Sequence, residues 1–189
     1  MLAMNTTYTS ILQQANLLIQ RNGFHGFSYA DLSKILGITK ASIHHHFPAK
    51  ADLGMAYCQQ KCEDLKQFQF QLTAKESAVE QLKAYFTIFT DCAKQGQMCG
   101  IYTMQSDLQL MSEPLQKQVI KLADLELEIL SDILQTGVAE QTFTFKVTAE
   151  QQAVIICCAI KGALMLNRSQ HHQGLFQQTC EALLETLSL

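Results

Sequence analysis

The sequence contains no tryptophan and only two prolines, Pro48 and Pro114, among its 189 residues. Because proline interrupts helices, this scarcity favours long helices. No segment alternates apolar and polar residues over a convincing strand length. The longest unbroken apolar run, residues 153–160, has eight residues, whereas a membrane span needs about 20. The expected fold class is therefore all-α, with about nine helices, and no membrane partner is predicted.

Export and enzyme motifs are also missing. The N-terminal segment MLAMNTTYTS has no basic region and no long apolar region, so we predict no secretory signal and a cytoplasmic protein. Seven cysteines are an odd number in such a chain, which argues against a disulfide framework. The sequence has no phosphate-binding glycine loop, no H-E-x-x-H and no G-x-S-x-G. We therefore expect no enzymatic activity, no catalytic residue and no cofactor.

Charged residues are few, at 16% of the chain, and the net charge of −3 does not by itself indicate a nucleic-acid-binding protein. The average conceals an asymmetry, because residues 1–53 carry a net charge of +2 and the remainder carries −5. A modestly positive end on an acidic body lets one end approach phosphate groups while the rest stays clear of them.

Helical periodicity divides the first part of the chain into short helices at about residues 9–21, 28–36 and 40–47. Gly37 ends the second helix, Thr39 can cap the third, and Pro48 stops it. Two short helices joined by a glycine-containing turn form the helix-turn-helix pattern. Such a motif reads DNA by placing its second helix in the major groove.

The remainder also has helical patterns, at about residues 50–70, 77–94, 114–133, 148–168 and 172–187. The segment from Val154 to Ile160 is apolar almost all round its helix, so it needs cover on more than one side. We therefore expect the last two helices to form a four-helix interface with those of a second copy.

The third short helix has two side chains that are expected to face the core and six that are expected to face outward or sideways. Ile43 and Phe47 are four residues apart and are expected to point inward. The residues left to face outward or sideways can contact bases and phosphates, and they are Lys40, Ala41, Ser42, His44, His45 and His46. Lys50 begins the next helix, where its side chain and the free backbone N–H groups can hold a phosphate.

These residues carry a resemblance to a known family. The matching pieces are Ala15…Arg21-Asn22-Gly23-Phe24…Phe27-Ser28…Asp31-Leu32, Leu36-Gly37-Ile38-Thr39-Lys40-Ala41-Ser42-Ile43 and His46-Phe47-Pro48-Ala49-Lys50…Leu53. Residues 11–53 resemble the DNA-binding domain of the TetR family of transcriptional repressors. The resemblance implies a helix-turn-helix domain at residues 1–53 and a helical effector-binding and dimerisation domain at 54–189.

The resemblance also implies a function. It implies a homodimer that binds a palindromic operator with two recognition helices and releases the DNA when a small molecule binds. The DNA-binding residues that it implies are Ser28, Tyr29, Thr39, Lys40, Ala41, Ser42, His44, His45, His46 and Lys50. The family usually has a tyrosine where this chain has His44. The alternative reading is a helical dimeric adaptor or small-molecule-binding protein without DNA binding.

Some histidines and cysteines admit a second interpretation. Adjacent helical residues point about 100° apart, so the three consecutive histidines cannot converge on one metal ion. Cys58 and Cys62 share a helix face, but two further ligands would have to come from elsewhere, so we expect buried thiols and no metal site. The pair His171-His172 is expected in a solvated turn.

Cys99 lies in Gly96-Gln97-Met98-Cys99-Gly100, a break between helices. A thiol at a helix start can react with electrophiles or oxidants, so it is a candidate sensor, although packing is the alternative role. The apolar residues expected to line an effector pocket, or equally to form core, are Phe86, Phe89, Met98, Tyr102, Met104, Met111 and Leu122.

Overall fold

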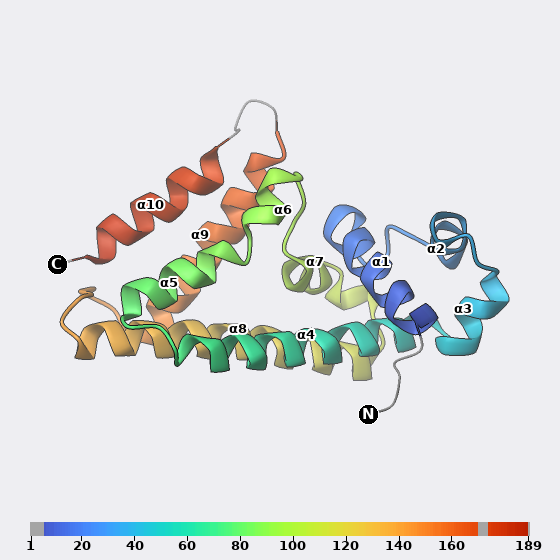
Figure 1. Cartoon of the computed structure of the whole chain (residues 1–189), viewed down its shortest axis with the longest axis horizontal. Coiled ribbons are helices and arrows are strands. Elements are labelled where there is room, and N and C mark those ends of the chain that lie inside the picture. Colours follow the sequence, from blue (N-terminus) through green and yellow to red (C-terminus); the bar gives the residue numbers. More distant parts are fainter. Residues whose placement is uncertain (1–5, 170–173, 189) are drawn as a thin grey trace. The chain divides into compact units, whose positions relative to one another are not determined.

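The computed structural model describes residues 6–169 and 174–188, and this part of the chain is all-α (Figure 1). Its helices are α1 (Thr6–Asn22), α2 (Tyr29–Leu36), α3 (Lys40–His46), α4 (Lys50–Leu72), α5 (Ala78–Thr87), α6 (Thr90–Lys94), α7 (Gly100–Ser106), the 3-10 helix η1 (Leu108–Leu110), α8 (Glu113–Ala139), α9 (Ala149–Asn167) and α10 (Leu175–Leu187). The predicted all-α class is confirmed. His171-His172 lies outside the described residues.

The sequence pattern at 77–94 predicted one helix, and the structure divides it in two. The N–H of Ile88 donates to the carbonyl of Tyr85, and the N–H of Phe89 donates to that of Phe86. These three-residue spacings tighten the last turn of α5 and end it. Phe89 is buried while Ile88 is 43% exposed, and α6 begins at Thr90.

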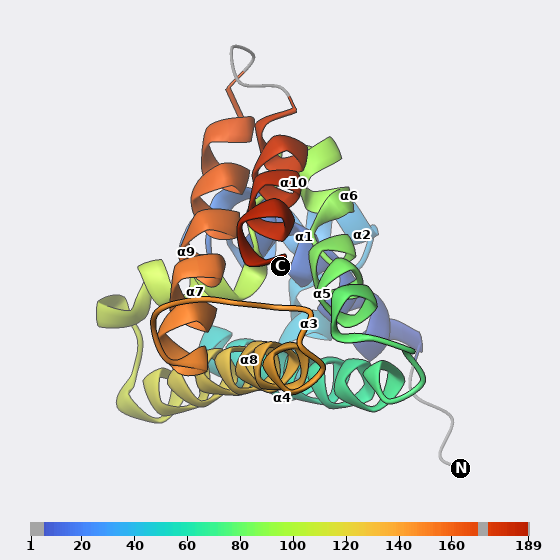
Figure 2. The same ribbon diagram turned by 90° about the vertical axis from the view of Figure 1, so that its left-hand side faces the viewer.

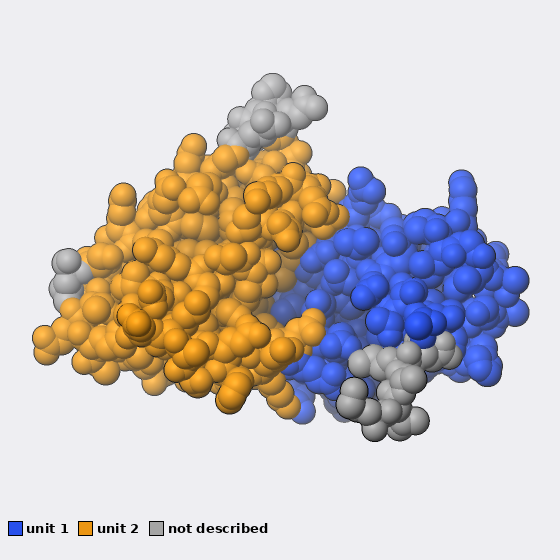
Figure 3. All heavy atoms as spheres, viewed as in Figure 1, with its two compact units in different colours: residues 1–63, 100–122 blue, residues 64–99, 123–189 orange. Residues whose placement is uncertain are grey.

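The chain forms two compact units (Figure 3), and neither is continuous in sequence. Unit 1 consists of residues 1–63 and 100–122, and unit 2 consists of residues 64–99 and 123–189. Helices α4 and α8 therefore contribute residues to both. The predicted domain boundary after residue 53 marks the end of the DNA-binding segment and not the end of a compact unit. It stays a prediction.

Unit 1 has its own apolar core. Helix α1 packs on α2 and on α7, and α2 packs on α3. The side chains at the centre of this core are fully buried, and they include Ile11, Ala15, Ile19, Leu32, Ile43 and Leu53. Segment 100–122 thus completes the environment of the N-terminal helices, which explains why the unit is discontinuous.

Unit 2 is centred on α9. Helices α9 and α10 lie side by side in both ribbon views (Figures 1 and 2), and α6 also packs on α9. The N–H of Thr144 donates to the carbonyl of Leu187 at 2.9 Å, which ties the segment after α8 to the end of α10. Residues buried here include Leu82, Leu130, Ile133, Ile156 and Ile160.

By length and composition, one helix of the described chain is apolar enough to cross a membrane, namely α9. Only 33% of its most apolar window is buried. The mean hydropathy reaches this level although Glu150 and Lys161 lie within the helix, because the apolar run between them dominates the average. Lys161 is buried and paired with Glu126, so the inner face of α9 is that of a globular core helix.

Candidate nucleic-acid interface

Helix α2 and the turn after it are fixed by local hydrogen bonds. Ser28 forms a capping box with Asp31, whose carboxylate accepts the Ser28 N–H and hydroxyl, both at 2.7 Å. The hydrogen bond from the Ser28 side chain is the main reason that the pKa of Asp31 is lowered. Gly37 ends the helix in the left-handed conformation, with φ of 66°, and the Ser33 hydroxyl donates to Ile38 O at 2.6 Å. The turn therefore presents α3 at a defined angle.

Helix α3 exposes the residues that were predicted to contact DNA. Thr39 caps it by accepting the N–H of Ser42 at 3.1 Å. Ile43 is fully buried and Phe47 is 2% exposed, as their spacing predicted. The opposite face is open to solvent at Lys40, Ala41, His44 and His45, whereas Ser42 and His46 are half-buried.

Tyr8 of α1 packs against Phe47 and His46 at the end of α3. The sequence did not predict this contact. The Tyr8 ring stacks on Phe47 with centroids 4.9 Å apart, and it meets the edge of His46 at 6.2 Å. The His46 side chain is thereby held against α1. The contact joins residues far apart in sequence, so no local pattern could have revealed it.

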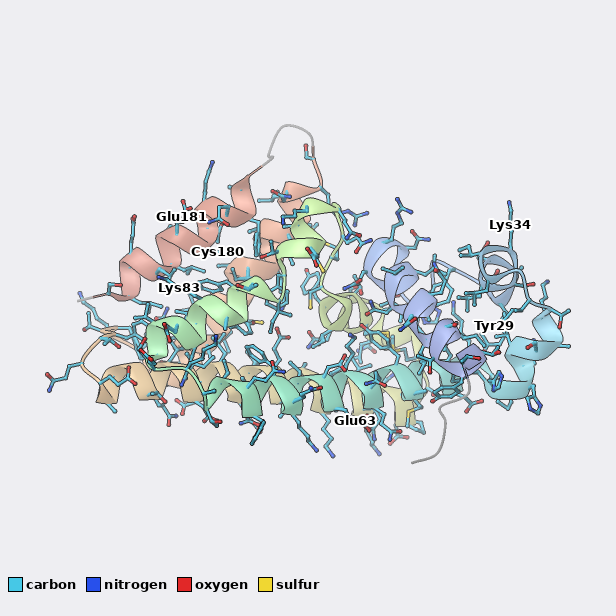
Figure 4. The ribbon with its side chains drawn as sticks, viewed as in Figure 1. Tyr29, Lys34, Glu63, Lys83, Cys180 and Glu181 are labelled. Carbon is cyan, nitrogen blue, oxygen red and sulfur yellow. The ribbon has the colours of Figure 1, made fainter. Side chains whose placement is uncertain are left out.

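Tyr29 connects α2 to the segment between α3 and α4 (Figure 4). Its hydroxyl lies 2.9 Å from Phe47 O and 2.8 Å from Ala49 O, and burial raises its pKa to about 12, with Asp52 adding to the effect. Its ring meets the edge of His44 at 4.8 Å. The His44 Nδ1 lies 3.1 Å from Pro48 O, which can only accept, so Nδ1 carries a hydrogen. Lys34, by contrast, extends away from this network.

Lys50 is turned inward. Its ammonium donates to Phe27 O and lies over the rings of Phe24 and Phe27, 5.2 and 4.2 Å from their centroids. Burial lowers its pKa, while Asp107 and Asp31 act in the opposite direction. A phosphate contact by this side chain would have to replace these contacts. The predicted phosphate contact therefore requires the Lys50 side chain to leave these partners, or the backbone N–H groups at the start of α4 make it instead.

Asp107 braces the turn between α1 and α2, and no sequence signal marked it. Its Oδ2 accepts the N–H of His25 at 3.1 Å, across 82 positions of sequence. Gly23, with φ of 83°, sits against this carboxylate, because a Cβ there would lie 3.2 Å from Oδ2. The segment that follows Cys99 is thus attached to the helix-turn-helix within unit 1.

We expect Asp107→Ala to lower the free energy of unfolding by about 1–2 kcal/mol, because the His25 N–H loses its acceptor. Urea titration measures this change. Asp107→Asn keeps an acceptor oxygen and is the matched control, so it should lose clearly less. Equal losses in the two variants would show that the hydrogen bond is not what the carboxylate contributes.

The residues of this site match a known family model. Residues 11–56 match the model of bacterial regulatory proteins of the tetR family. The fold matches the crystal structure of a TetR family transcriptional regulator from Agrobacterium tumefaciens, at 28% identity and a TM-score of 0.90, over 97% of this chain and 98% of that chain. A TetR regulator from Legionella pneumophila is 27% identical, with a TM-score of 0.85 and complete coverage of both chains. No curated protein matches the sequence.

The chain is a TetR family transcriptional regulator. It is a DNA-binding protein and not an enzyme. More distant structures share the fold, among them the reduced form of NemR from E. coli, at 18% identity and a TM-score of 0.78, over 96% of this chain and 97% of that chain. FadR from Bacillus subtilis, solved in complex with stearoyl-CoA, is also 18% identical, with a TM-score of 0.70, over 95% of this chain and 98% of that chain.

The predicted effector-pocket residues of this TetR regulator divide between the two units. Phe86, Phe89, Met98 and Cys99 are buried in unit 2. In unit 1, Met104, Met111 and Leu122 are buried, whereas Tyr102 is 38% exposed. The structure therefore places four of the eight predicted effector-site residues in unit 2, and it assigns Met104 and Leu122 to the core of unit 1.

A buried polar cluster lies among the unit 2 residues. Lys161 Nζ contacts Glu126 Oε1 at 2.5 Å and lies 3.7 Å above the Phe89 ring, and the Tyr85 hydroxyl donates to the same Glu126 oxygen at 2.9 Å. Burial acts to lower the pKa of Lys161, but attraction to Cys99, Glu126 and Cys157 outweighs it and raises the pKa. Burial and the negative charge of Glu126 raise the pKa of Tyr85.

One feature of the sequence marks this cluster, namely a lysine inside an otherwise apolar helix. This feature alone does not predict a buried ion pair, because charged residues on helices are usually solvated. The described residues contain no group of three or more histidine, cysteine or acidic side chains that could hold a metal ion. All seven cysteines are free thiols, and Cys99 is buried just before α7.

Proposed function

We propose that this regulator represses transcription by binding a palindromic operator as a homodimer, and that it leaves the operator when an effector binds or when Cys99 is modified. The observation that carries the proposal is the outward face of α3, which is open opposite the buried pair Ile43 and Phe47. Such a face fits the major groove of B-DNA. We place this activity in the cytoplasm.

Roles are proposed residue by residue for the exposed positions. Lys40, Ala41, Ser42 and His45 read base edges, because lysine and serine hydrogen-bond to bases and an alanine methyl can lie against a thymine methyl. The residues proposed to contact the DNA backbone are Ser28, Tyr29, Thr39, His44, His46 and Lys50. The His44 ring is well placed for this role, because its Nδ1 bond to Pro48 O orients the second nitrogen.

Selection of bound sequences from a random pool of duplex DNA tests the proposal. We expect an inverted repeat whose half-sites lie about 34–36 Å apart, or a multiple of one helical turn. Ser42→Arg should change the base preferred at one position of each half-site. Enrichment of no sequence, or of unpaired half-sites alone, would contradict the homodimeric repressor.

The effector branch rests on unit 2. Phe86, Phe89 and Met98 are buried apolar side chains there, and Lys161 of the polar cluster lies 3.7 Å above the Phe89 ring. We propose that these three residues line the effector site. FadR, which shares this fold, was solved in complex with stearoyl-CoA, and this supports a small-molecule effector for the present regulator. An effector acts only by preferring the state that cannot bind DNA.

The thiol branch rests on Cys99, which interacts electrostatically with the Lys161 ammonium. We expect mild alkylation to modify Cys99 faster than the other buried thiols, Cys58, Cys92 and Cys180, because a nearby positive charge favours the reactive thiolate. Peptide mass spectrometry over a time course measures this order. If Cys99 reacts no faster than Cys58, Cys92 and Cys180, modification plays no part and the effector branch remains.

A further inference from the structure

Cys99 and Cys157 are two thiols of unit 2 that meet at the buried polar cluster. Cys157 lies four residues, or about one turn, before Lys161 on α9, so the two side chains share a face of the helix. Both thiols interact electrostatically with the Lys161 ammonium and with the Tyr85 hydroxyl, and they interact with each other. The cluster therefore contains a pair of thiols from segments far apart in the sequence.

Backbone contacts bring the segment that carries Cys99 to α9. Helix α6 packs on α9, and the Asn167 side chain of α9 donates to a carbonyl of α6 at 2.9 Å. A Schellman motif then ends α6, because Gly96 has φ of 61° and the N–H of Gln97 donates to Cys92 O at 2.8 Å. Cys99 follows two residues after this turn, so local hydrogen bonds fix where its segment runs.

The two thiols differ in burial and in acidity. Cys99 is 5% exposed, and the positive charge of Lys161 favours its thiolate, which is the form that oxidants attack. Cys157 is half-buried, and burial raises its pKa to about 12, with Glu126 adding to the effect and Lys161 opposing it. Cys99 is therefore the thiol that is oxidised first, and Cys157 is the thiol that reacts with the product.

The burial of Cys99 limits the class of oxidant. Exchange with a bulky disulfide such as oxidised glutathione needs direct access to the sulfur, which the surrounding core denies. Hydrogen peroxide is only slightly larger than water and needs no wide opening. A small hydroperoxide therefore fits this thiol better than a disulfide does.

We propose that Cys99 and Cys157 form an intramolecular disulfide when a hydroperoxide oxidises Cys99, and that this bond lowers the affinity for the operator. The inference rests on the thiol branch of the proposed function. It adds the second thiol, the oxidant class and the product. Disulfides of cytoplasmic proteins are usually of this transient, sensing kind.

The chemistry proceeds in two steps. The Cys99 sulfur takes one oxygen atom from hydrogen peroxide to become a sulfenic acid, and one water is released. The Cys157 sulfur then attacks the Cys99 sulfur, and the hydroxyl group leaves with the Cys157 proton as a second water. In total the two thiols lose two electrons and two protons, and the peroxide is reduced to two waters.

The position of Cys99 in the chain connects this bond to DNA binding. Cys99 is the residue at which the chain leaves unit 2, and Gly100 begins α7 in unit 1. A Cβ at Gly100 would overlap the Tyr57 hydroxyl, so the chain has no slack at this point. Helix α7 packs on α1, and Asp107 just after it braces the α1–α2 turn. A disulfide that draws Cys99 to α9 therefore pulls on the support of the helix-turn-helix.

Oxidation of the full chain tests the link. After treatment with hydrogen peroxide and blocking with N-ethylmaleimide, peptide mass spectrometry without reduction should find positions 99 and 157 joined in the larger part of the protein. The same concentration of oxidised glutathione should join them much more slowly, because Cys99 is buried. A link from Cys99 to Cys158 or to another thiol, or a Cys99 that stays unlinked, would overturn the proposal.

Two neighbouring cysteines of α9 provide matched variants. Cys157→Ser should lose the link, and Cys99 should then continue to the sulfinic acid, which dithiothreitol does not reduce. Cys158→Ser changes the exposed thiol one residue away and should keep the link. Loss of the link in both variants would show that the pairing does not depend on the position of Cys157.

Operator affinity tests the regulatory part. We expect peroxide to lower the affinity of the wild type about tenfold or more, and dithiothreitol to restore it. In Cys157→Ser the loss should not be reversed by dithiothreitol. A link that forms without changing the affinity would overturn the regulation. A reduced wild type that binds no operator would contradict the proposed function itself, while the link can still be mapped, so the two failures are distinguishable.

Discussion

Glu126→Ala should lower the free energy of unfolding by about 3–5 kcal/mol, the largest stability loss that we expect from a single substitution in this chain. The change leaves the Lys161 ammonium in a core position where only 4% of its side chain is exposed. It also removes the acceptor of the Tyr85 hydroxyl. Urea titration at one fixed protein concentration measures the loss, since dimerisation makes stability depend on concentration.

The double variant Glu126→Leu with Lys161→Met is the control for this prediction. It removes both charges while keeping similar volumes, so only the lost acceptor of the Tyr85 hydroxyl should still destabilise it, by about 1–3 kcal/mol. A double variant as unstable as Glu126→Ala would show that the loss comes from packing and not from an unpaired charge. The ion pair between Glu126 and Lys161 would then contribute nothing to the free energy of unfolding.

Operator affinity should rise about tenfold or more as the pH falls from about 8 to 6 at constant salt. Histidine gains its positive charge over this interval, and a hydrogen bond from a charged donor contributes about 1.5–3 kcal/mol. His44 and His45 are exposed on α3, and the Nδ1 of His44 lies 3.1 Å from Pro48 O. A positively charged ring is attracted to the phosphate groups of DNA, so we expect the affinity to rise as the pH falls. Fluorescence anisotropy with a labelled operator measures it.

The variant His44→Gln/His45→Gln should have a much flatter profile, because glutamine hydrogen-bonds without titrating. His25→Gln changes an exposed histidine of the α1–α2 turn instead and should keep the wild-type slope. An affinity that does not change with pH in the wild type would contradict the backbone role proposed for His44. A slope lost equally in the His25 variant would locate the titrating group outside α3.

Local rules accounted for the helix-turn-helix. Ser28 and Asp31 form the expected capping box, Gly37 adopts the left-handed conformation, and Thr39 caps α3 as predicted. Each of these features depends on residues within five positions of one another. Such interactions form in the same way whatever the rest of the chain does, so the residue types and their spacing were sufficient.

The division of 77–94 into α5 and α6 was not predictable in this way. The spacing of Leu82, Phe86, Phe89 and Cys92 fits a continuous helix as well as a broken one. In the structure, three-residue hydrogen bonds at Ile88 and Phe89 end α5, and the Tyr85 and Phe89 rings meet at 5.3 Å. Periodicity records which side chains are apolar, but it does not record the direction from which other helices cover them.

The sequence by itself determined the all-α class, the order of the helices and the exposed face of α3, because caps, breaks and helical periodicity are properties of neighbouring residues. Tertiary structure alone decided that Lys50 turns inward to Phe27, that Asp107 braces the turn at His25, and that Lys161 meets Glu126 inside unit 2. These contacts join residues 23, 82 and 35 positions apart. Charged groups at such separations find their partners only after the apolar faces of the helices have packed and excluded water from around them.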